Sequence, residues 1–361
     1  MKPLEIVRHR LIHQRLAGDR FDTAGDVVRW LGAVQAQEFA EVMWSLAERT
    51  QACGHAEVEA AFGRGDFIRT HALRPTWHFL ANEDVRWLLR LTRPRVHALN
   101  RYMYRKLDLD ANVLQRGHDV LARTLSASGP LTRRELAAHL AAAGVEAEGL
   151  RLGYVLMHAE LEEVICSGPR RGRSQTYALL DDRVPVSPTD DRPRESSVDE
   201  LVVRYFRSHG PATVNDFTAW SSLTVADTKA ALARVGSELD RDEDETGKAW
   251  YYAKSSPATT SDRLSGAFLV PMYDETIVAY QDLRVVLANE PPRPGLLDRA
   301  IVIDGRTVGS WRRTLSARSV LIEATLFGPL TPSETQKLHD VAARFGAFLG
   351  LEPVLTTTVA V

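Results

Sequence analysis

Residues 129–181 read GPLTRRELAAHLAAAGVEAEGLRLGYVLMHAELEEVICSGPRRGRSQTYALLD, and this stretch decides the fold. A Thr132 N-cap followed three residues later by Glu135 is the pattern of a capping box. An Ala-rich helix, a C-cap at Gly144 and a second amphipathic helix follow, and two short extended pieces then flank the basic turn PRRGRS. A helix–turn–helix followed by a β-hairpin is typical of a winged helix, with the basic turn at the wing tip.

Similar patterns occur on both sides of this stretch. Residues 210–217, GPATVNDF, open another helix with Thr213 as N-cap and Asp216 three residues on, and LDRDEDETGKAWYYA then indicates a hairpin with an acidic tip. In the first hundred residues, helical segments precede FIRTHALRPTWHFL, which alternates and breaks at Pro75 like a hairpin. From about residue 263 the chain is rich in strand patterns, and Asp304-Gly305 is a strong two-residue hairpin signal.

These patterns predict an α+β protein with three tandem winged-helix units and a C-terminal β-rich region. We place the winged helices at residues 1–108, 109–192 and 193–262, and the β-rich region at residues 263–361.

The composition is that of a globular protein: 361 residues, 44% of them hydrophobic. No run of about 18 apolar residues indicates a membrane span, and the N-terminus lacks the pattern of a signal peptide. Two distant cysteines, Cys53 and Cys166, offer no zinc framework. His9 and His13 have metal-ligand spacing but no third ligand, so we interpret them as structural. We expect a cytoplasmic protein, associated with the nucleoid when bound to DNA, that uses no metal and no cofactor.

The net charge of −2 argues by itself against a nucleic-acid partner, but the distribution of charge is more informative. Between Arg64 and Lys106 there are ten Lys or Arg residues against three acids. Such a basic stripe could meet phosphates, or it could be a set of solvated helix faces in an Arg-rich protein.

Five segments in order resemble the winged-helix DNA glycosylases of the AlkZ/YcaQ type. They read LGAVQAQEFAEVMWSLAERT, FIRTHALRPTWHFL, GPATVNDFTAWSSL, LVPMYDETIVAYQDLR and IVIDGRTVGSWRR. The resemblance runs from about residue 5 to residue 350 and implies a monofunctional glycosylase that removes N7-alkylated purines from double-stranded DNA, acting as a monomer. For some members it also implies unhooking of interstrand crosslinks, including those left by a producer's own antibiotic. Self-resistance and general base excision repair both remain open.

The resemblance implies that Gln35 and Gln37, in the motif Gln-x-Gln, are the catalytic residues. Their neutral carbonyls can hold a water by accepting its hydrogens, which suits a substrate whose leaving base already carries positive charge. Residues i and i+2 share a face only in extended chain, so we expect the preceding helix to break near Val34–Gln37. The alternative is an inert, solvated Gln pair on a helix.

The residues that we predict to contact DNA are Arg69, Arg74, Thr76, Trp77, His78, Arg170, Arg171, Arg173, Arg312 and Arg313. In the alternative interpretation, Trp77 belongs to a core face and His78 is a hydrogen-bonded structural residue. Asp274 and Glu275 could be catalytic carboxylates, but in YDETIVAY we interpret them as orienting backbone or basic side chains.

A second function class is a non-enzymatic winged-helix transcriptional regulator. Such a regulator usually joins one winged helix to a ligand-binding or dimerisation domain, whereas this chain is predicted to consist mostly of winged helices. The two classes differ in whether Gln35 and Gln37 line a DNA-binding surface or point away from it.

Overall fold

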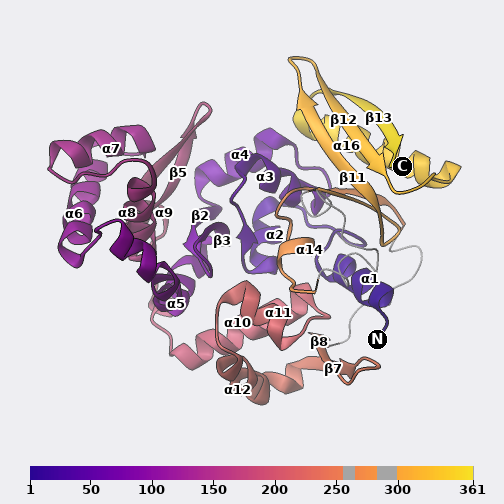
Figure 1. The fold of residues 1–361 in the computed structure, drawn as a ribbon, viewed down its shortest axis with the longest axis horizontal. Coiled ribbons are helices and arrows are strands. Elements are labelled where there is room, and N and C mark those ends of the chain that lie inside the picture. The colour runs from indigo at the N-terminus through magenta and orange to yellow at the C-terminus, as the bar shows by residue number, and fades with distance from the viewer. Residues whose placement is uncertain (255–264, 283–298, 361) are drawn as a thin grey trace. The chain divides into compact units, whose positions relative to one another are not determined.

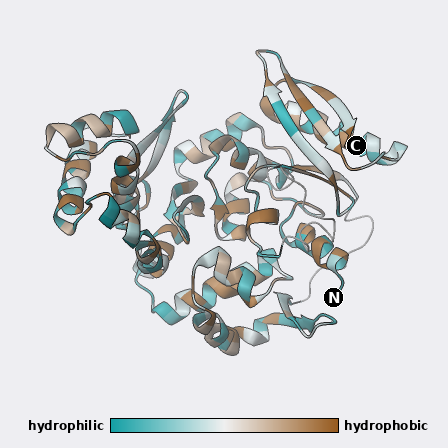
Figure 2. Ribbon diagram, viewed as in Figure 1, coloured by the Kyte–Doolittle hydropathy of each residue, from teal (hydrophilic) through white to brown (hydrophobic). Residues whose placement is uncertain are grey.

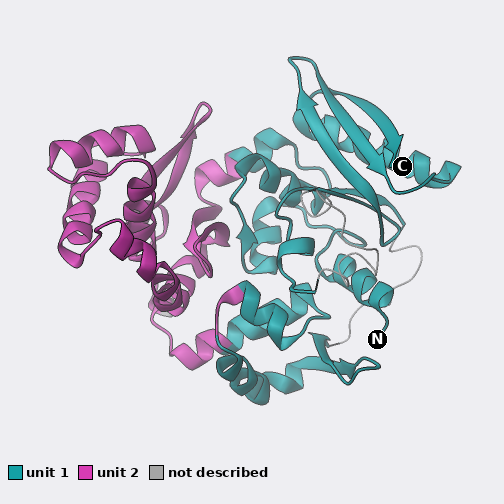
Figure 3. Cartoon of the chain, in the orientation of Figure 1, with its two compact units in different colours: residues 1–59, 199–220, 224–361 teal, residues 60–198, 221–223 magenta. Residues whose placement is uncertain are grey.

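The computed structural model describes residues 1–254, 265–282 and 299–360 (Figure 1). By contacts the chain forms two compact units (Figure 3). Unit 1 comprises residues 1–59, 199–220 and 224–361, and unit 2 comprises residues 60–198 and 221–223. The four segments predicted from the sequence are a different division of the chain and stay predictions; the boundary at 262–263 lies outside the described residues.

Unit 2 combines helices with two β-hairpins. Its elements are β2 (Phe67–Ala72), β3 (Thr76–Ala81), η1 (Asn82–Asp84), α5 (Val85–Lys106), α6 (Ala111–Ser128), β4 (Leu131–Thr132), α7 (Arg133–Ala142), α8 (Gly149–Leu161), β5 (Ile165–Arg171), β6 (Ser174–Leu179), α9 (Leu180–Arg183) and η2 (Pro188–Asp190).

The local signals around residues 129–181 are confirmed. Thr132 and Glu135 form the reciprocal capping box of α7. Gly144 has a φ of +73°, which a residue without a Cβ adopts at little cost. The expected hairpin is present as β5 and β6, and the short strand β4 pairs with β6 to give a sheet of order β4-β6-β5. Buried aliphatic side chains of α6, α7 and α8 form the core beside this sheet.

Unit 1 holds most of the remaining elements. Its helices and short strands are α1 (Pro3–His13), α2 (Ala24–Leu31), β1 (Val34–Gln35), α3 (Phe39–Glu48), α12 (Val225–Val235), η3 (Gly236–Glu238), β7 (Leu239–Glu243), β8 (Ala249–Ala253) and α14 (Glu275–Val278). Three helices contain residues of both units, namely α4 (His55–Arg64), α10 (Arg194–His209) and α11 (Val214–Ser221). The expected Thr213 cap is present, because its hydroxyl accepts the Asp216 N–H at 3.2 Å.

A five-stranded sheet and a long helix form the C-terminal part of unit 1. The strands are β9 (Ala267–Val270), β10 (Ala300–Ile303), β11 (Arg306–Leu315), β12 (Ser319–Leu326) and β13 (Glu352–Val359), and the helix is α16 (Pro332–Leu349). The sheet order is β13-β12-β11-β10-β9, antiparallel except for the β12–β13 pair. Buried and exposed residues alternate along β12, and hydrophobic and hydrophilic colours alternate on this sheet in Figure 2.

The turn between β10 and β11 is the hairpin expected at Asp304-Gly305. Both residues have positive φ, +50° and +79°, as a two-residue primed turn requires. Ile303 pairs with Arg306 directly across the turn. The prediction of a mixed α+β fold is therefore confirmed. Within the described residues, no helix has the length and apolar character that crossing a membrane requires.

The core of unit 2 gives a direct test of its packing. Leu156 is 1% exposed, whereas Leu150 on the same helix is 59% exposed. Leu156→Ala should lower the free energy of unfolding by about 2–5 kcal/mol because it leaves a cavity. Leu150→Ala should change it by no more than about 0.5 kcal/mol. Urea denaturation followed by circular dichroism measures both, and equal effects would contradict this assignment of the core.

Candidate functional site

The Gln35–Gln37 segment is not helical. Helix α2 ends at Leu31, Gly32 has a φ of +77°, and Val34 and Gln35 are extended as β1 before α3 begins at Phe39. The expected break of the helix is thus confirmed. The strand ends at Gln35 and Gln37 lies in the bend that leads to α3, so the shared face that a water between the two glutamines requires stays a prediction.

The glutamine pair is also not a solvated surface pair. Gln35 is 9% exposed, Ala36 is fully buried, and Gln37 is half-buried. A buried amide side chain is held by its surroundings and cannot move freely among rotamers. The interpretation as inert glutamines on an exposed helix therefore does not fit the structure.

The backbone of Gln35 is fixed by a buried carboxylate. Its N–H donates to Glu275 Oε1 at 2.7 Å, and Glu275 is fully buried. The other carboxylate oxygen, Oε2, accepts the indole N–H of Trp220 at 3.0 Å and lies 3.4 Å from Nε2 of His209. Hydrogen bonds to a charged acceptor are stronger than neutral ones, so Glu275 holds the extended segment firmly.

Asp274, the neighbour of Glu275, forms the main buried ion pair of the site. The Arg49 guanidinium donates to both of its oxygens at 2.8 Å, and the Ser45 hydroxyl donates to Oδ2 at 2.6 Å. Asp274 also caps α14 by accepting the Thr276 N–H. Burial opposes its ionised form, but the charge and hydrogen bonds of Arg49 prevail and hold the pKa of Asp274 below its ordinary value.

Gln14 links this ion pair to the rest of the network. Its Oε1 accepts from Arg49 at 3.0 Å, and its Nε2 donates to the backbone carbonyl of Glu275 and to the Tyr280 hydroxyl. The Tyr280 hydroxyl in turn donates to the backbone carbonyl of His209 at 2.7 Å. Every member of this network lies in unit 1 and is buried.

The network explains what Asp274 and Glu275 do. Each carboxylate is occupied by donors from protein side chains or backbone, as the interpretation that they orient other groups requires. Glu275 positions the glutamine segment, and Asp274 holds the arginine that supports Gln14. Sequence reasoning missed Arg49, Gln14 and Trp220, because the contacts that give them a role join parts of the chain far apart in sequence.

The residues predicted in the first hairpin lie in unit 2, on β2, β3 and the turn between them. Arg69 is 6% exposed and its guanidinium lies 4.2 Å from the centre of the Trp77 ring. His78 is fully buried, and burial lowers its pKa well below the ordinary value. Arg74 is half-buried in the turn, and Thr76, the first residue of β3, has a buried hydroxyl. The geometry agrees with a structural role for His78 and leaves Arg74 as the more accessible candidate for DNA contact.

Part of the basic stripe is neutralised within unit 2. Arg86 is buried and pairs with Asp181 at 2.6 Å, and Arg90 pairs with Glu163 at 2.9 Å. Arg101, Arg105 and Lys106, at the end of α5, are exposed. The charge available to a polyanion is therefore smaller than the count of ten basic residues suggests.

The three arginines predicted at the second hairpin differ in their surroundings. Arg171 pairs with Glu135 at 2.7 Å, and Arg170 donates to the backbone carbonyl of Arg173. Arg173 is exposed at the tip.

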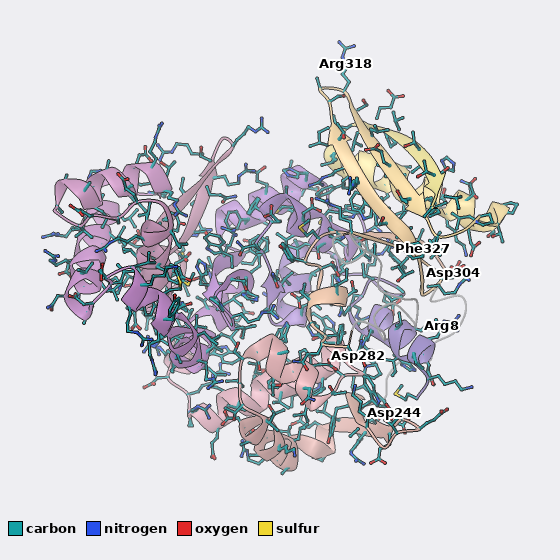
Figure 4. All side chains as sticks on the ribbon, in the orientation of Figure 1. Arg8, Asp244, Asp282, Asp304, Arg318 and Phe327 are labelled. Atoms are coloured by element: carbon teal, nitrogen blue, oxygen red, sulfur yellow. The ribbon has the colours of Figure 1, made fainter. Side chains whose placement is uncertain are left out.

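The two arginines of β11 point to opposite faces, as alternation along a strand requires. Arg312 is exposed, whereas Arg313 is partly buried and pairs with Glu41 at 2.8 Å. Arg318, at the tip of the β11–β12 hairpin, extends away from the sheet (Figure 4). Its exposed position next to the hairpin turn was not singled out from the sequence.

His13 fits the structural role expected of it, and the ring centre of His9 lies 5.9 Å from that of His13. Nδ1 of His13 lies 2.6 Å from the backbone carbonyl of Gly210, so this nitrogen carries the hydrogen and donates it. Burial, only partly offset by that hydrogen bond, lowers the pKa of His13 to about 4.

Comparison with known proteins places the chain among DNA glycosylases. A family model described as DNA glycosylase AlkZ-like matches residues 28–348. A curated relative from Streptomyces sahachiroi, named interstrand DNA cross-link repair glycosylase, is 27% identical over 327 residues, covering 85% of this chain and 86% of the relative. The solved structure of Streptomyces sahachiroi DNA glycosylase AlkZ matches with a TM-score of 0.78 and 20% identity over all of both chains, which shows a shared fold.

The pH dependence of stability tests the burial of Glu48, the last residue of α3. Burial raises its pKa to about 7 from the usual 4.5, although the positive charge of Arg344 opposes the shift. Between about pH 4.5 and about pH 7 this carboxyl group is therefore protonated in the folded protein and ionised in the unfolded chain. The free energy of unfolding consequently falls as the pH rises through this range. Glu48→Gln removes this penalty, which is on the order of 3 kcal/mol above pH 7.

The measurement is the melting temperature at pH 5 and at pH 8. The melting temperature of Glu48→Gln minus that of the wild type should be larger at pH 8 than at pH 5. The exposed Glu352→Gln is the control and should show no such change. A difference for Glu48→Gln that is the same at both pH values would contradict the assignment.

Proposed function

Because the chain belongs to the AlkZ-like DNA glycosylase family, and is accordingly a DNA glycosylase, we propose that it hydrolyses the N-glycosidic bond of N7-alkylated purines. Gln35 and Gln37 are the proposed catalytic residues. The observation that carries the proposal is the extended, buried Gln35 segment, whose backbone N–H is held by Glu275 at 2.7 Å.

The departing base needs little assistance from the protein. Alkylation at N7 gives the purine a positive charge, so the base departs neutral and needs no general acid. The sugar that remains is electron-poor and must be captured by a water. Two side-chain carbonyls of Gln35 and Gln37 would accept the hydrogens of that water and place its oxygen at the sugar carbon. Placement of this kind can lower a barrier by several kcal/mol without a strong base.

The relative from Streptomyces sahachiroi is named a cross-link repair glycosylase. We extend that substrate class to this chain as a proposal: the enzyme releases alkylated purines that also carry a crosslink or a bulky adduct. The neutral second glutamine favours such activated lesions, because it offers no carboxylate to assist a poorer leaving group.

We also propose that the fold contains three winged helices. In unit 2 the order α6, β4, α7, α8, β5, β6 and the sheet β4-β6-β5 support one of them. A similar order occurs in α10, α11, α12, β7 and β8. An isolated bridge joins Ala212 to Tyr251 of β8, at the place in this order that corresponds to β4. The order of helices and strands seen from α6 to β6 occurs again in α2, β1, α3, α4, β2 and β3.

For DNA contact we propose basic residues that solvent can reach in each unit: the half-buried Arg74 and the exposed Arg173 in unit 2, and the exposed Arg312 and Arg318 in unit 1. Phosphate contacts from such residues position a duplex without reading its sequence. Family membership does not favour the alternative of a non-enzymatic regulator. A single copy of the chain, acting as a monomer, is proposed to bind the duplex.

Catalysis is tested by removing each glutamine. Gln35→Ala and Gln37→Ala should each slow excision of 7-methylguanine by about 10²–10³-fold, since one well-placed hydrogen bond is worth about 2–4 kcal/mol of barrier. The double variant should be little slower than the slower single variant, because both residues act on one water. Single-turnover release of the base measures the rate, and duplex affinity should be retained.

The exposed Gln51→Ala in the same unit is the matched control and should keep the wild-type rate. Gln37→Asp should preserve or raise the rate, because a carboxylate can also accept the hydrogens of the water. A folded Gln35→Ala/Gln37→Ala protein that excises at the wild-type rate would overturn the proposal.

DNA binding is tested at the tip of the β5–β6 hairpin. Arg173→Ala should weaken binding to damaged and undamaged duplex alike, and should reduce the slope of log affinity against log salt by about one. Arg171→Ala is the matched control with a smaller expected effect, because Glu135 already neutralises Arg171. Fluorescence anisotropy at several salt concentrations measures both, and an Arg173→Ala protein with an unchanged affinity and slope would remove this contact.

A further inference from the structure

Three histidines and a glutamate meet where α5, α6 and α8 of unit 2 come together. The ring centres of His97 and His158 are 4.6 Å apart, and those of His118 and His158 are 5.0 Å apart. Nε2 of His97 lies 2.9 Å from Oε1 of Glu162. These residues belong to unit 2, and nothing in the proposed glycosylase reaction uses them.

The donor atoms have the spacing of a metal site. One ligand atom from each of His97, His158 and Glu162 lies within 4.8 Å of the other two. A tetrahedral zinc ion with bonds of about 2.0–2.1 Å holds its ligand atoms about 3.3 Å apart. The 2.9 Å between His97 and Glu162 is a few tenths of an ångström shorter than this, and the other separations reach up to 4.8 Å, so binding an ion requires the side chains to rotate inward.

Helical spacing brings two of these donors to one face. His158 is in α8 and Glu162 caps its C-terminal end, so the pair has the i, i+4 relation that places side chains one above the other. His97 reaches them from α5. An ion bound here would therefore link two helices of the unit.

The histidines also have the outer partners that metal-binding histidines usually have. Nδ1 of His97 lies 2.8 Å from the Tyr104 hydroxyl. Nδ1 of His158 lies 3.0 Å from Nε2 of His118. Such contacts at one ring nitrogen orient the ring and direct the lone pair of the other nitrogen toward a metal.

Two imidazoles and a carboxylate are a ligand set that zinc accepts. Arg93 competes for the other carboxylate oxygen of Glu162, at 3.5 Å.

A cavity of about 600 Å³ lies beside the cluster, and Gln115, His118, Asp119, His158 and Glu162 are among its lining residues. The cavity leaves room for a water or small ligand in a fourth coordination position. Three protein ligands with an open fourth position are the arrangement of many zinc sites.

We propose that His97, His158 and Glu162 bind one divalent transition-metal ion, with Zn²⁺ the best match to two imidazoles and a carboxylate. His118 and Tyr104 orient the two histidines. The sequence prediction of a metal-free protein depended on the cysteines and on His9 and His13. It missed this cluster because its members come from three helices.

The test uses the untagged full-length chain, stripped of metal with a chelator. Zn²⁺ is titrated by calorimetry, and Co²⁺ is titrated by its visible absorption, which reports tetrahedral coordination. We expect one ion per chain, a tetrahedral cobalt spectrum that Zn²⁺ abolishes, and a higher melting temperature with Zn²⁺. His158→Asn and Glu162→Gln should each weaken the affinity by about 100-fold or more. His118→Asn, which removes only an outer partner, should weaken it by about 10–100-fold.

His139→Asn, an exposed histidine of α7 in the same unit, is the matched control and should bind like the wild type. Glu162→Gln preserves the shape of the side chain, so it remains informative if the histidine variant fails to fold. The proposal is overturned if the wild type gives no tetrahedral cobalt spectrum. It is also overturned if folded Glu162→Gln binds zinc with the wild-type affinity.

Discussion

Two adjacent carboxylates, Asp274 and Glu275, are buried where water cannot reach them, and the rest of the site depends on how they are satisfied. An ionised carboxylate removed from water costs several kcal/mol unless donors and opposite charge replace the lost hydration. Arg49 supplies the charge, and Ser45, Trp220 and the Gln35 backbone supply hydrogen bonds. These donors come from three segments, namely α3 with its C-cap Arg49, α11 and β1, so satisfying the two carboxylates brings those segments together.

The arrangement has a consequence for catalysis. A chain that leaves a helix loses the intrahelical partner of each backbone N–H, and a buried N–H without a partner is costly. At Gln35 that partner is Glu275. The hydrogen bond to the carboxylate therefore stabilises an extended glutamine segment inside the protein. A reaction that relies on placing one water needs such rigidity more than it needs a strong base.

Local signals predicted from the sequence were accurate where they depended on a few neighbouring residues. The Thr132 and Thr213 caps and the Asp304-Gly305 turn each follow from short-range chemistry. The break after α2 was predicted instead from the requirement that two glutamines share one water. Long-range pairing was not predictable in this way. The burial of Arg69, the pairing of Arg313 with Glu41 and the convergence of His97 with His158 depend on contacts between distant segments. A single sequence does not show which charges will meet.

Glu275 acts by holding the glutamine segment, and the variant Glu275→Gln tests this role most directly. The amide NH₂ of the new side chain removes the bond to Gln35 in one orientation, and in the other it leaves Gln35 only a neutral acceptor, so the hydrogen bond that holds Gln35 is lost or weakened in either case. In single-turnover excision of 7-methylguanine, the folded variant should be about 10-fold to 100-fold slower while its duplex affinity is retained. The exposed Glu323→Gln should match the wild type in both measurements. A folded Glu275→Gln enzyme that excises at the wild-type rate would contradict the account.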